Sequence, residues 1–137
     1  MSFFIFEPFI QFSGENIEGS LPQLALTAGF SQRDWVFMEE IQFKADNERF
    51  SWKIDYGERN SEIGYGAIYE WLTKSDFEFP QLEKDLNTII RSDKTEIRFT
   101  GSTNQRNDTL TQEQIQDIKD ILELYQMMMD DADLFNY

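Results

Sequence analysis

The sequence predicts an α+β fold, in which helices pack on one face of an antiparallel sheet of about four strands within a single domain over residues 1–137. Three observations favour this class. Two segments with apolar side chains at every second position flank a turn between residues 35 and 56. A capped amphipathic pattern begins at residue 111 and predicts a long C-terminal helix, with residues 130–137 frayed. Aromatic residues make up 15% of the chain, which indicates a packed core.

The first segment, residues 3–12, is rich in Phe and Ile and predicts a strand. Pro8 lies inside it and has no backbone N–H to donate, so it restricts the strand to an edge, a bulge or an interruption. The pattern of residues 20–30 is ambiguous. Pro22 would suit the first position of a helix that follows Ser20 or Leu21.

The clearest local signal is a β-hairpin around the turn residues 45–48. Pairing Phe43 with Phe50 sets the register and places Ile41 opposite Trp52 on one face. Extending this register brings a further aromatic pair onto the same face, Phe37 with Tyr56.

Charge supports the same register. It places Glu40 opposite Lys53 on the other face, and such a cross-strand pair contributes up to about 1 kcal/mol. Glu39 is the exception, because the register turns its side chain toward the apolar face. We therefore expect a bulge or an edge position at Glu39.

Two helices are expected in the middle of the chain. Ser61 is the predicted cap of a short helix over residues 62–74, whose Gly64 and Gly66 weaken its start. This helix would turn three apolar side chains inward, Ile68, Trp71 and Leu72. Pro80 opens the second helix, whose apolar residues recur at helical spacing: Leu82, Leu86, Ile89 and Ile90.

A strand and a polar loop are expected to follow. The alternation of Ile97 and Phe99 predicts a short strand over residues 95–100. Residues 101–108 are polar apart from Gly101 and predict a connecting loop that ends at Asp108. This loop is either a plain connector or a place of contact, since loops held out by a rigid scaffold often carry function.

The last helix has the best signature. Thr111 is its predicted N-cap and Gln114 completes a capping box. An apolar stripe follows at spacings of three and four residues: Ile115, Ile118, Leu122, Tyr125 and Met129. The stripe predicts either a face buried in the core or the seam of a homodimer.

Acidic residues outnumber basic residues by 26 to 12, which gives a net charge of −14. Half of the excess lies in residues 108–137, where Lys119 is the one base. This charge repels nucleic-acid phosphate and anionic lipid, so neither nucleic acid nor a membrane surface is an expected partner. The N-terminus lacks the basic region of a signal peptide, and no apolar run approaches the roughly 20 residues of a membrane span. A cytoplasmic location is therefore expected.

The chain contains neither His nor Cys. This excludes the Ser-His-Asp triad, thiol nucleophiles and zinc–thiolate sites. Residues 55–62 have the composition of a calcium loop without its alternating ligands, and residues 64–67 lack the rest of a phosphate-binding glycine motif. We predict no catalytic residue, metal site or cofactor.

The candidate site is an acidic surface for a basic protein partner. Glu113, Asp117 and Asp120 fall on one side of the last helix, away from its apolar stripe, with Glu123 nearby. Asp108, from the loop before the helix, is expected to join them. An ordinary solvated helix face is the alternative interpretation. Acids alone would not hold a complex, because apolar anchors supply most of the affinity at interfaces.

Small size, acidity and the absence of His and Cys give the chain a general profile that is similar to bacterial immunity proteins and antitoxins that block nuclease toxins. No motif aligns with a known family of them, so no residues are carried over. The profile implies that acidic side chains occupy the groove where a toxin would hold phosphate. Two alternatives stay open: a phage-type DNA-mimic inhibitor of a defence enzyme, and a small metal-dependent enzyme or accessory subunit that uses carboxylates.

Overall fold

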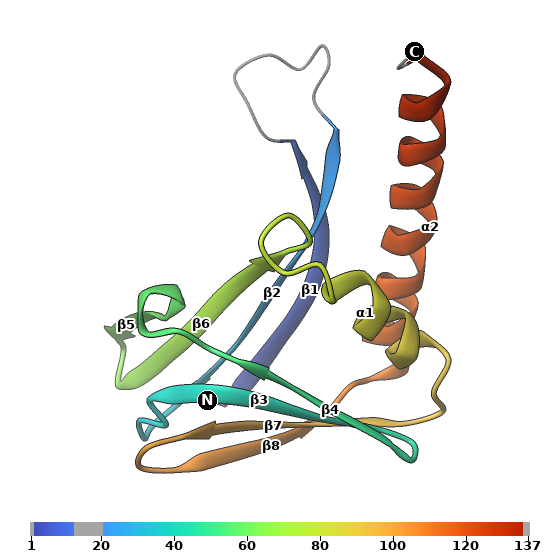
Figure 1. Ribbon diagram of the computed structural model, residues 1–137. Helices are drawn as coiled ribbons and strands as arrows, with labels where there is room; N and C mark the ends of the chain where they lie inside the picture. The colour runs from blue at the N-terminus through green and yellow to red at the C-terminus, as the bar shows by residue number, and fades with distance from the viewer. Residues whose placement is uncertain (1, 13–20, 136–137) are drawn as a thin grey trace.

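The computed structural model describes residues 2–12 and 21–135, which form an α+β chain with two four-stranded antiparallel sheets and two α-helices (Figure 1). The expected α+β class and the long C-terminal helix are confirmed. The expectation of one sheet of about four strands is wrong, because three further segments form strands: the ambiguous residues 22–30, the expected helix over residues 62–74 and the expected loop over residues 101–108.

The first sheet has the strand order β1-β2-β6-β5. Its strands are β1 (Phe3–Phe12), β2 (Pro22–Gln32), β6 (Ala67–Ser75) and β5 (Asn60–Gly64). Pro8 lies on β1, opposite Leu26 and at the edge of the sheet, as predicted. Residues 22–30 belong to β2, so the helical alternative is wrong for them, and Pro22 occupies the first position of a strand, where it is tolerated. Ser20 lies outside the described residues.

The helix predicted over residues 62–74 is wrong, because this segment forms the hairpin β5–β6. Tyr65 and Gly66 have φ angles of 52° and 75° and make a tight turn of the kind that joins two strands. In β6, Trp71 is half-buried on one side of the strand while Glu70 and Leu72 are buried on the other. The period is therefore two, although the spacing of Ile68, Trp71 and Leu72 also fits a helix.

The second sheet has the strand order β4-β3-β7-β8. Its strands are β4 (Glu48–Lys53), β3 (Met38–Ala45), β7 (Thr95–Gly101) and β8 (Gln105–Thr109). The predicted hairpin register is confirmed by three pairs: Phe43 with Phe50, Ile41 with Trp52, and Glu40 with Lys53.

Of two further predictions for this sheet, one is confirmed and one is wrong. The ladder register shifts between Met38 and Glu40, which leaves Glu39 exposed, so the bulge expected there is confirmed. The pair Phe37 with Tyr56 is wrong, because Phe37 precedes β3 with a φ of 56° and Tyr56 belongs to a 3₁₀ turn, η1 (Tyr56–Glu58).

Residues 101–108 were expected to form a loop and instead form the last residue of β7, the turn and most of β8. Gly101 donates its backbone N–H to the carbonyl of Asn104 at 3.1 Å and closes the turn. β8 lies at the edge of the second sheet and carries only polar side chains, so it shows no apolar alternation from which to predict a strand. The strand predicted over residues 95–100 is confirmed.

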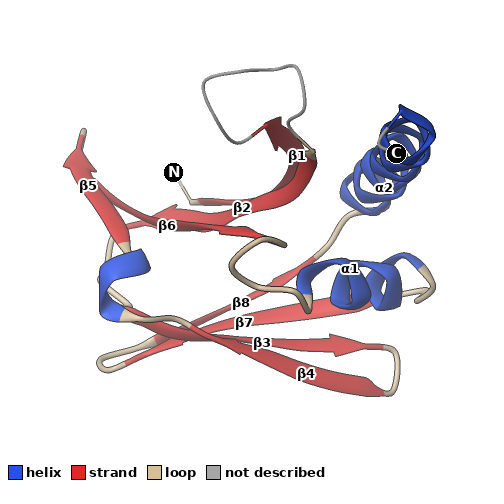
Figure 2. Ribbon diagram, turned by 45° about the horizontal axis from the view of Figure 1, so that its top comes forward, coloured by secondary structure: helices blue, strands red, loops and turns tan. Residues whose placement is uncertain are grey.

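Aromatic side chains hold the two sheets together. Phe6 of β1 contacts Phe43 and Trp52 of the second sheet, with ring centroids 5.9 and 6.1 Å apart. Phe30 of β2 contacts Phe99 of β7 at 5.0 Å. Figure 2 shows the sheets as two layers, with the short helix α1 between them at one side.

Both helices that were predicted after residue 80 are confirmed: α1 (Leu82–Ile90) and α2 (Gln112–Phe135). Thr111 and Gln114 form the capping box at the start of α2, with bonds of 2.9 and 3.1 Å. α2 packs against α1, β1 and β2 (Figure 1). Among the described residues, no helix is long and apolar enough to cross a membrane.

Asp85 of α1 is a buried carboxylate, 5% exposed, that accepts a 2.8 Å hydrogen bond from Trp52 Nε1. Burial raises the pKa of Asp85, although the bond from Trp52 opposes the rise. The folded state therefore binds this proton more tightly than the unfolded state, and the contribution of Asp85 to stability falls as pH rises through its folded pKa.

The amide oxygen of Asp85→Asn still accepts the Trp52 bond. We expect the difference in free energy of unfolding between this variant and the wild type to shift in favour of the variant as pH rises from about 4 to about 7. Urea unfolding at both pH values measures this difference. Glu83→Gln removes a carboxylate from the same turn without touching Trp52 and is the matched control. A difference that shrinks as pH rises would contradict the assignment.

Candidate functional site

The apolar stripe of α2 is buried in the core of the chain itself. Ile115, Ile118, Leu122 and Tyr125 are at most 8% exposed, and Met129 packs against the core from its margin. The Tyr125 hydroxyl donates a 2.5 Å hydrogen bond to the carboxylate of Asp76, which joins the helix to the segment after β6. A homodimer through this stripe would first have to remove α2 from the core.

The opposite side of α2 presents the predicted acids to solvent. Glu113, Asp117, Asp120 and Glu123 are all exposed, at spacings of four, three and three residues; we call these four residues the acidic ridge. The structure therefore places four of the five predicted site residues on one helix. Asp120 accepts a 2.9 Å bond from the amide of Gln116. Within the described part of the chain, none of the four forms an ion pair.

Two apolar side chains interrupt the same side of the helix. Leu124 is 46% exposed and Met127 is 65% exposed. Leu124 follows Asp120 by four residues and Met127 follows Leu124 by three, which keeps both on the face of the ridge. Asp131, which is exposed, follows Met127 after one more turn. Acids thus flank this apolar pair on both sides along the helix, a feature that we did not predict although the helical spacing carries its signal.

Asp108, the fifth predicted site residue, does not belong to the ridge. It lies on β8, where Arg106 holds its carboxylate with two bonds of 2.7 and 3.1 Å, and both side chains are only 12% exposed. Arg106 also donates to the Ser31 carbonyl at 3.2 Å and lies over the Phe30 ring at 5.5 Å. Asp108 therefore helps to join β8 to the first sheet, and its assignment to the partner surface is not supported by its position.

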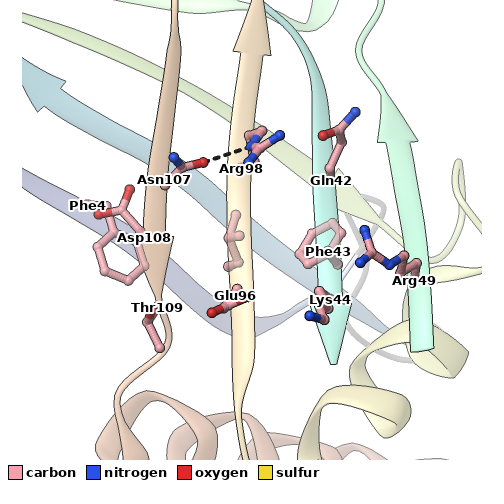
Figure 3. Close-up of a pocket in the computed structure, with 11 residues that line it drawn as sticks. Phe4, Gln42, Phe43, Lys44, Arg49, Glu96, Arg98, Asn107, Asp108 and Thr109 are labelled. Atoms are coloured by element: carbon pink, nitrogen blue, oxygen red, sulfur yellow. Dashed lines mark hydrogen bonds between the residues drawn. The ribbon is translucent and has the colours of Figure 1, made fainter. Parts of the chain in front are cut away.

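A hollow of about 600 Å³ lies along the second sheet and includes Asp108 in its lining (Figure 3). Figure 3 shows side chains from its four strands around the hollow, with Arg98 bonded to Asn107. Three basic side chains belong to the lining: Lys44, Arg49 and Arg98. Its other carboxylate, Glu96, pairs with Lys94 at 3.1 Å, and this bond lowers the pKa of Glu96. The hollow thus brings together no two free carboxylates of the kind that acid–base catalysis would use.

The segments that were compared with ion and phosphate loops have structural roles. Glu58 lies in residues 55–62, the segment with the composition of a calcium loop. Its carboxylate caps the η1 turn by accepting the Asp55 backbone N–H at 3.0 Å, and it forms an ion pair with Lys74 at 2.9 Å. The Gly64–Ala67 segment is the β5–β6 turn. Across residues 2–12 and 21–131, no three acidic side chains lie close enough to hold a metal ion.

Comparison of the chain with protein-family models, with curated protein sequences and with solved structures finds no match in any of the three. Function has therefore to be inferred from the surface chemistry of the chain.

The Arg106–Asp108 pair predicts a measurable coupling. We expect Arg106→Met to lower the free energy of unfolding by about 2 kcal/mol, because it leaves the largely buried Asp108 carboxylate without its partner. Asp108→Asn in the same chain should recover part of that loss. Urea unfolding of the two single variants and the double variant gives the coupling energy.

Arg98→Met is the control, since Arg98 is an exposed arginine on the neighbouring strand and should change stability by no more than about 0.5 kcal/mol. Effects of Arg106→Met and Asp108→Asn that simply add would show that the two side chains do not stabilise each other in the folded chain.

Proposed function

We propose that this chain is a stoichiometric binding protein that neutralises a basic protein partner through the acidic ridge of α2. The observation that carries the proposal is the orientation of this helix. Its apolar stripe is buried in the core, so the ridge and the exposed Leu124 and Met127 face solvent on an element that is already fixed. Binding therefore requires little ordering of the ridge backbone.

The charges of the ridge suit a cationic surface. Its four carboxylates have no ion-pair partner in the described part of the chain, and the whole chain carries a net charge of −14. Complementary charge of this kind accelerates association and sets the orientation of the partner. The same charge disfavours binding to acidic proteins and nucleic acid.

The two exposed apolar side chains that follow the ridge supply contact that charge alone does not. Leu124 and Met127 are exposed among acids, and burying such side chains at the centre of an interface adds affinity. Met is also flexible and adapts to an irregular partner surface.

The partner class that fits best is a nuclease toxin. A nuclease binds phosphate with basic side chains, and the carboxylates of this chain would bind those side chains in place of phosphate. In this proposal the chain acts as an immunity protein or antitoxin. A DNA-binding defence enzyme would present the same electrostatics. If such an enzyme is the partner, this chain should compete with duplex DNA for binding to it.

Reversal of two ridge charges tests the proposal. The cationic partner is captured from the source cell by the wild-type chain, purified, and its association rate is measured by surface plasmon resonance. We expect Asp117→Lys with Asp120→Lys to lower the association rate constant by about tenfold or more, with the fold intact by circular dichroism.

Glu39→Lys with Glu48→Lys is the matched control, since both residues are exposed on the second sheet and the change in net charge is identical. Equal losses in the two double variants would mean that net charge, and not the ridge, drives association. Unfolding of the ridge variant would assign Asp117 and Asp120 to the structure instead.

A further inference from the structure

The outer side of the first sheet carries a strip of apolar side chains. The strand register aligns Phe3 of β1 with Tyr69 of β6, and Ile5 with Trp71, across β2. The rings of Tyr69 and Trp71 stack with centroids 4.5 Å apart, and Phe3 lies 6.3 Å from Tyr69. We call these four residues the aromatic face.

The aromatic face points away from the core. The residues that alternate with it, such as Phe6 and Phe30, contact the second sheet. Figure 2 shows the second sheet and α1 on the other side of the first sheet. Phe3 is 47% exposed, while Ile5, Tyr69 and Trp71 are half-buried. Contiguous apolar surface on a folded chain is typical of an interaction site.

Close packing within the sheet holds this face in place. Gly29 of β2 lies beside Trp71, and a Cβ at Gly29 would come within 2.6 Å of the Trp71 Cβ and 2.5 Å of the Glu70 carbonyl. Any side chain at Gly29 would therefore push β6 away from β2. Because the rings are already positioned, binding to them costs little conformational entropy.

The charges around the aromatic face are acidic. The register puts Glu62 beside Tyr69 and places Glu7 two residues beyond Ile5 on the same side. Burial, and then the charge of Glu7, raise the pKa of Tyr69. Among the described strands of this sheet the only base is Lys74, which pairs with Glu58 and is 7% exposed.

We propose that the aromatic face is a second docking surface for the cationic partner and takes an apolar segment that carries Lys or Arg. This inference rests on the proposed function and names a second place where the partner is held. Tyr and Trp are enriched among the residues that contribute most to protein interfaces. Lys and Arg side chains bind aromatic rings through cation–π contacts and would also approach Glu7 and Glu62. A surface that binds nucleic acid would instead need Lys or Arg residues beside the aromatic rings.

Two peptides of equal length and charge test the proposal by amide NMR titration of the full chain: one alternates Lys with Leu, the other Lys with Ser. We expect both peptides to shift the amide signals of α2, and only the Lys–Leu peptide to shift those of Phe3, Tyr69 and Trp71. A third peptide that alternates Glu with Leu should shift neither set.

Tyr69→Ser with Trp71→Ser should weaken binding of the Lys–Leu peptide by about tenfold or more. Tyr56→Ser with Phe77→Ser is the matched control, because these side chains are 85% and 77% exposed outside the face. Phe3→Ser, at the exposed end of the face, replaces the double variant if that variant fails to fold.

The outcomes separate the two proposals. Lys–Leu shifts confined to α2, or a Glu–Leu peptide that binds the aromatic face equally well, would overturn the second docking surface and leave the ridge standing. Self-association of the wild-type chain through the face would overturn it as well. Failure of both cationic peptides to shift α2 would instead contradict the proposed function.

Discussion

The packing of α2 against β1, β2 and α1 is the contact on which the rest of the molecule depends. Burial of Ile118 and its neighbours on the stripe closes the side of the core that the two sheets leave to the helices. The same burial fixes the rotation of the helix about its axis, so the ridge must face solvent. The packing of α2 therefore determines both which side chains close the core and which carboxylates face solvent.

The acidic residues divide into two groups with different roles. Glu70 is 4% exposed and accepts the backbone N–H groups of Val36 and Met38 at 2.9 and 3.1 Å, while Asp85 and Asp108 are held by Trp52 and Arg106. These carboxylates satisfy buried donors and are part of the fold. Those of the ridge satisfy no buried donor, so their charge remains available to another molecule. Acidity alone does not identify this difference; the partner of each carboxylate does.

Sequence patterns succeeded where one interaction dominates. The register of Phe43 with Phe50 follows from alternation and from the Glu40–Lys53 pair, and the start of α2 follows from its capping box. They failed where two periods fit, as at residues 62–74, where the positive φ angles of Tyr65 and Gly66 decide for a hairpin. The ridge could be predicted from helical spacing alone. The position of Asp108 could not, because β8 has no apolar alternation that would predict a strand. The aromatic face could not either, because it depends on the pairing of β2 with β6, which are distant in sequence.

The most direct measurement of the central claim is the ionic-strength dependence of the association rate between the wild-type chain and its purified cationic partner. Salt shortens the screening length from about 10 Å at 0.1 M to about 3 Å at 1 M, so attraction between the ridge and a basic surface weakens over this range. We predict that the rate constant falls steeply as salt rises. A rate constant that stays level from low to high salt would contradict electrostatic docking.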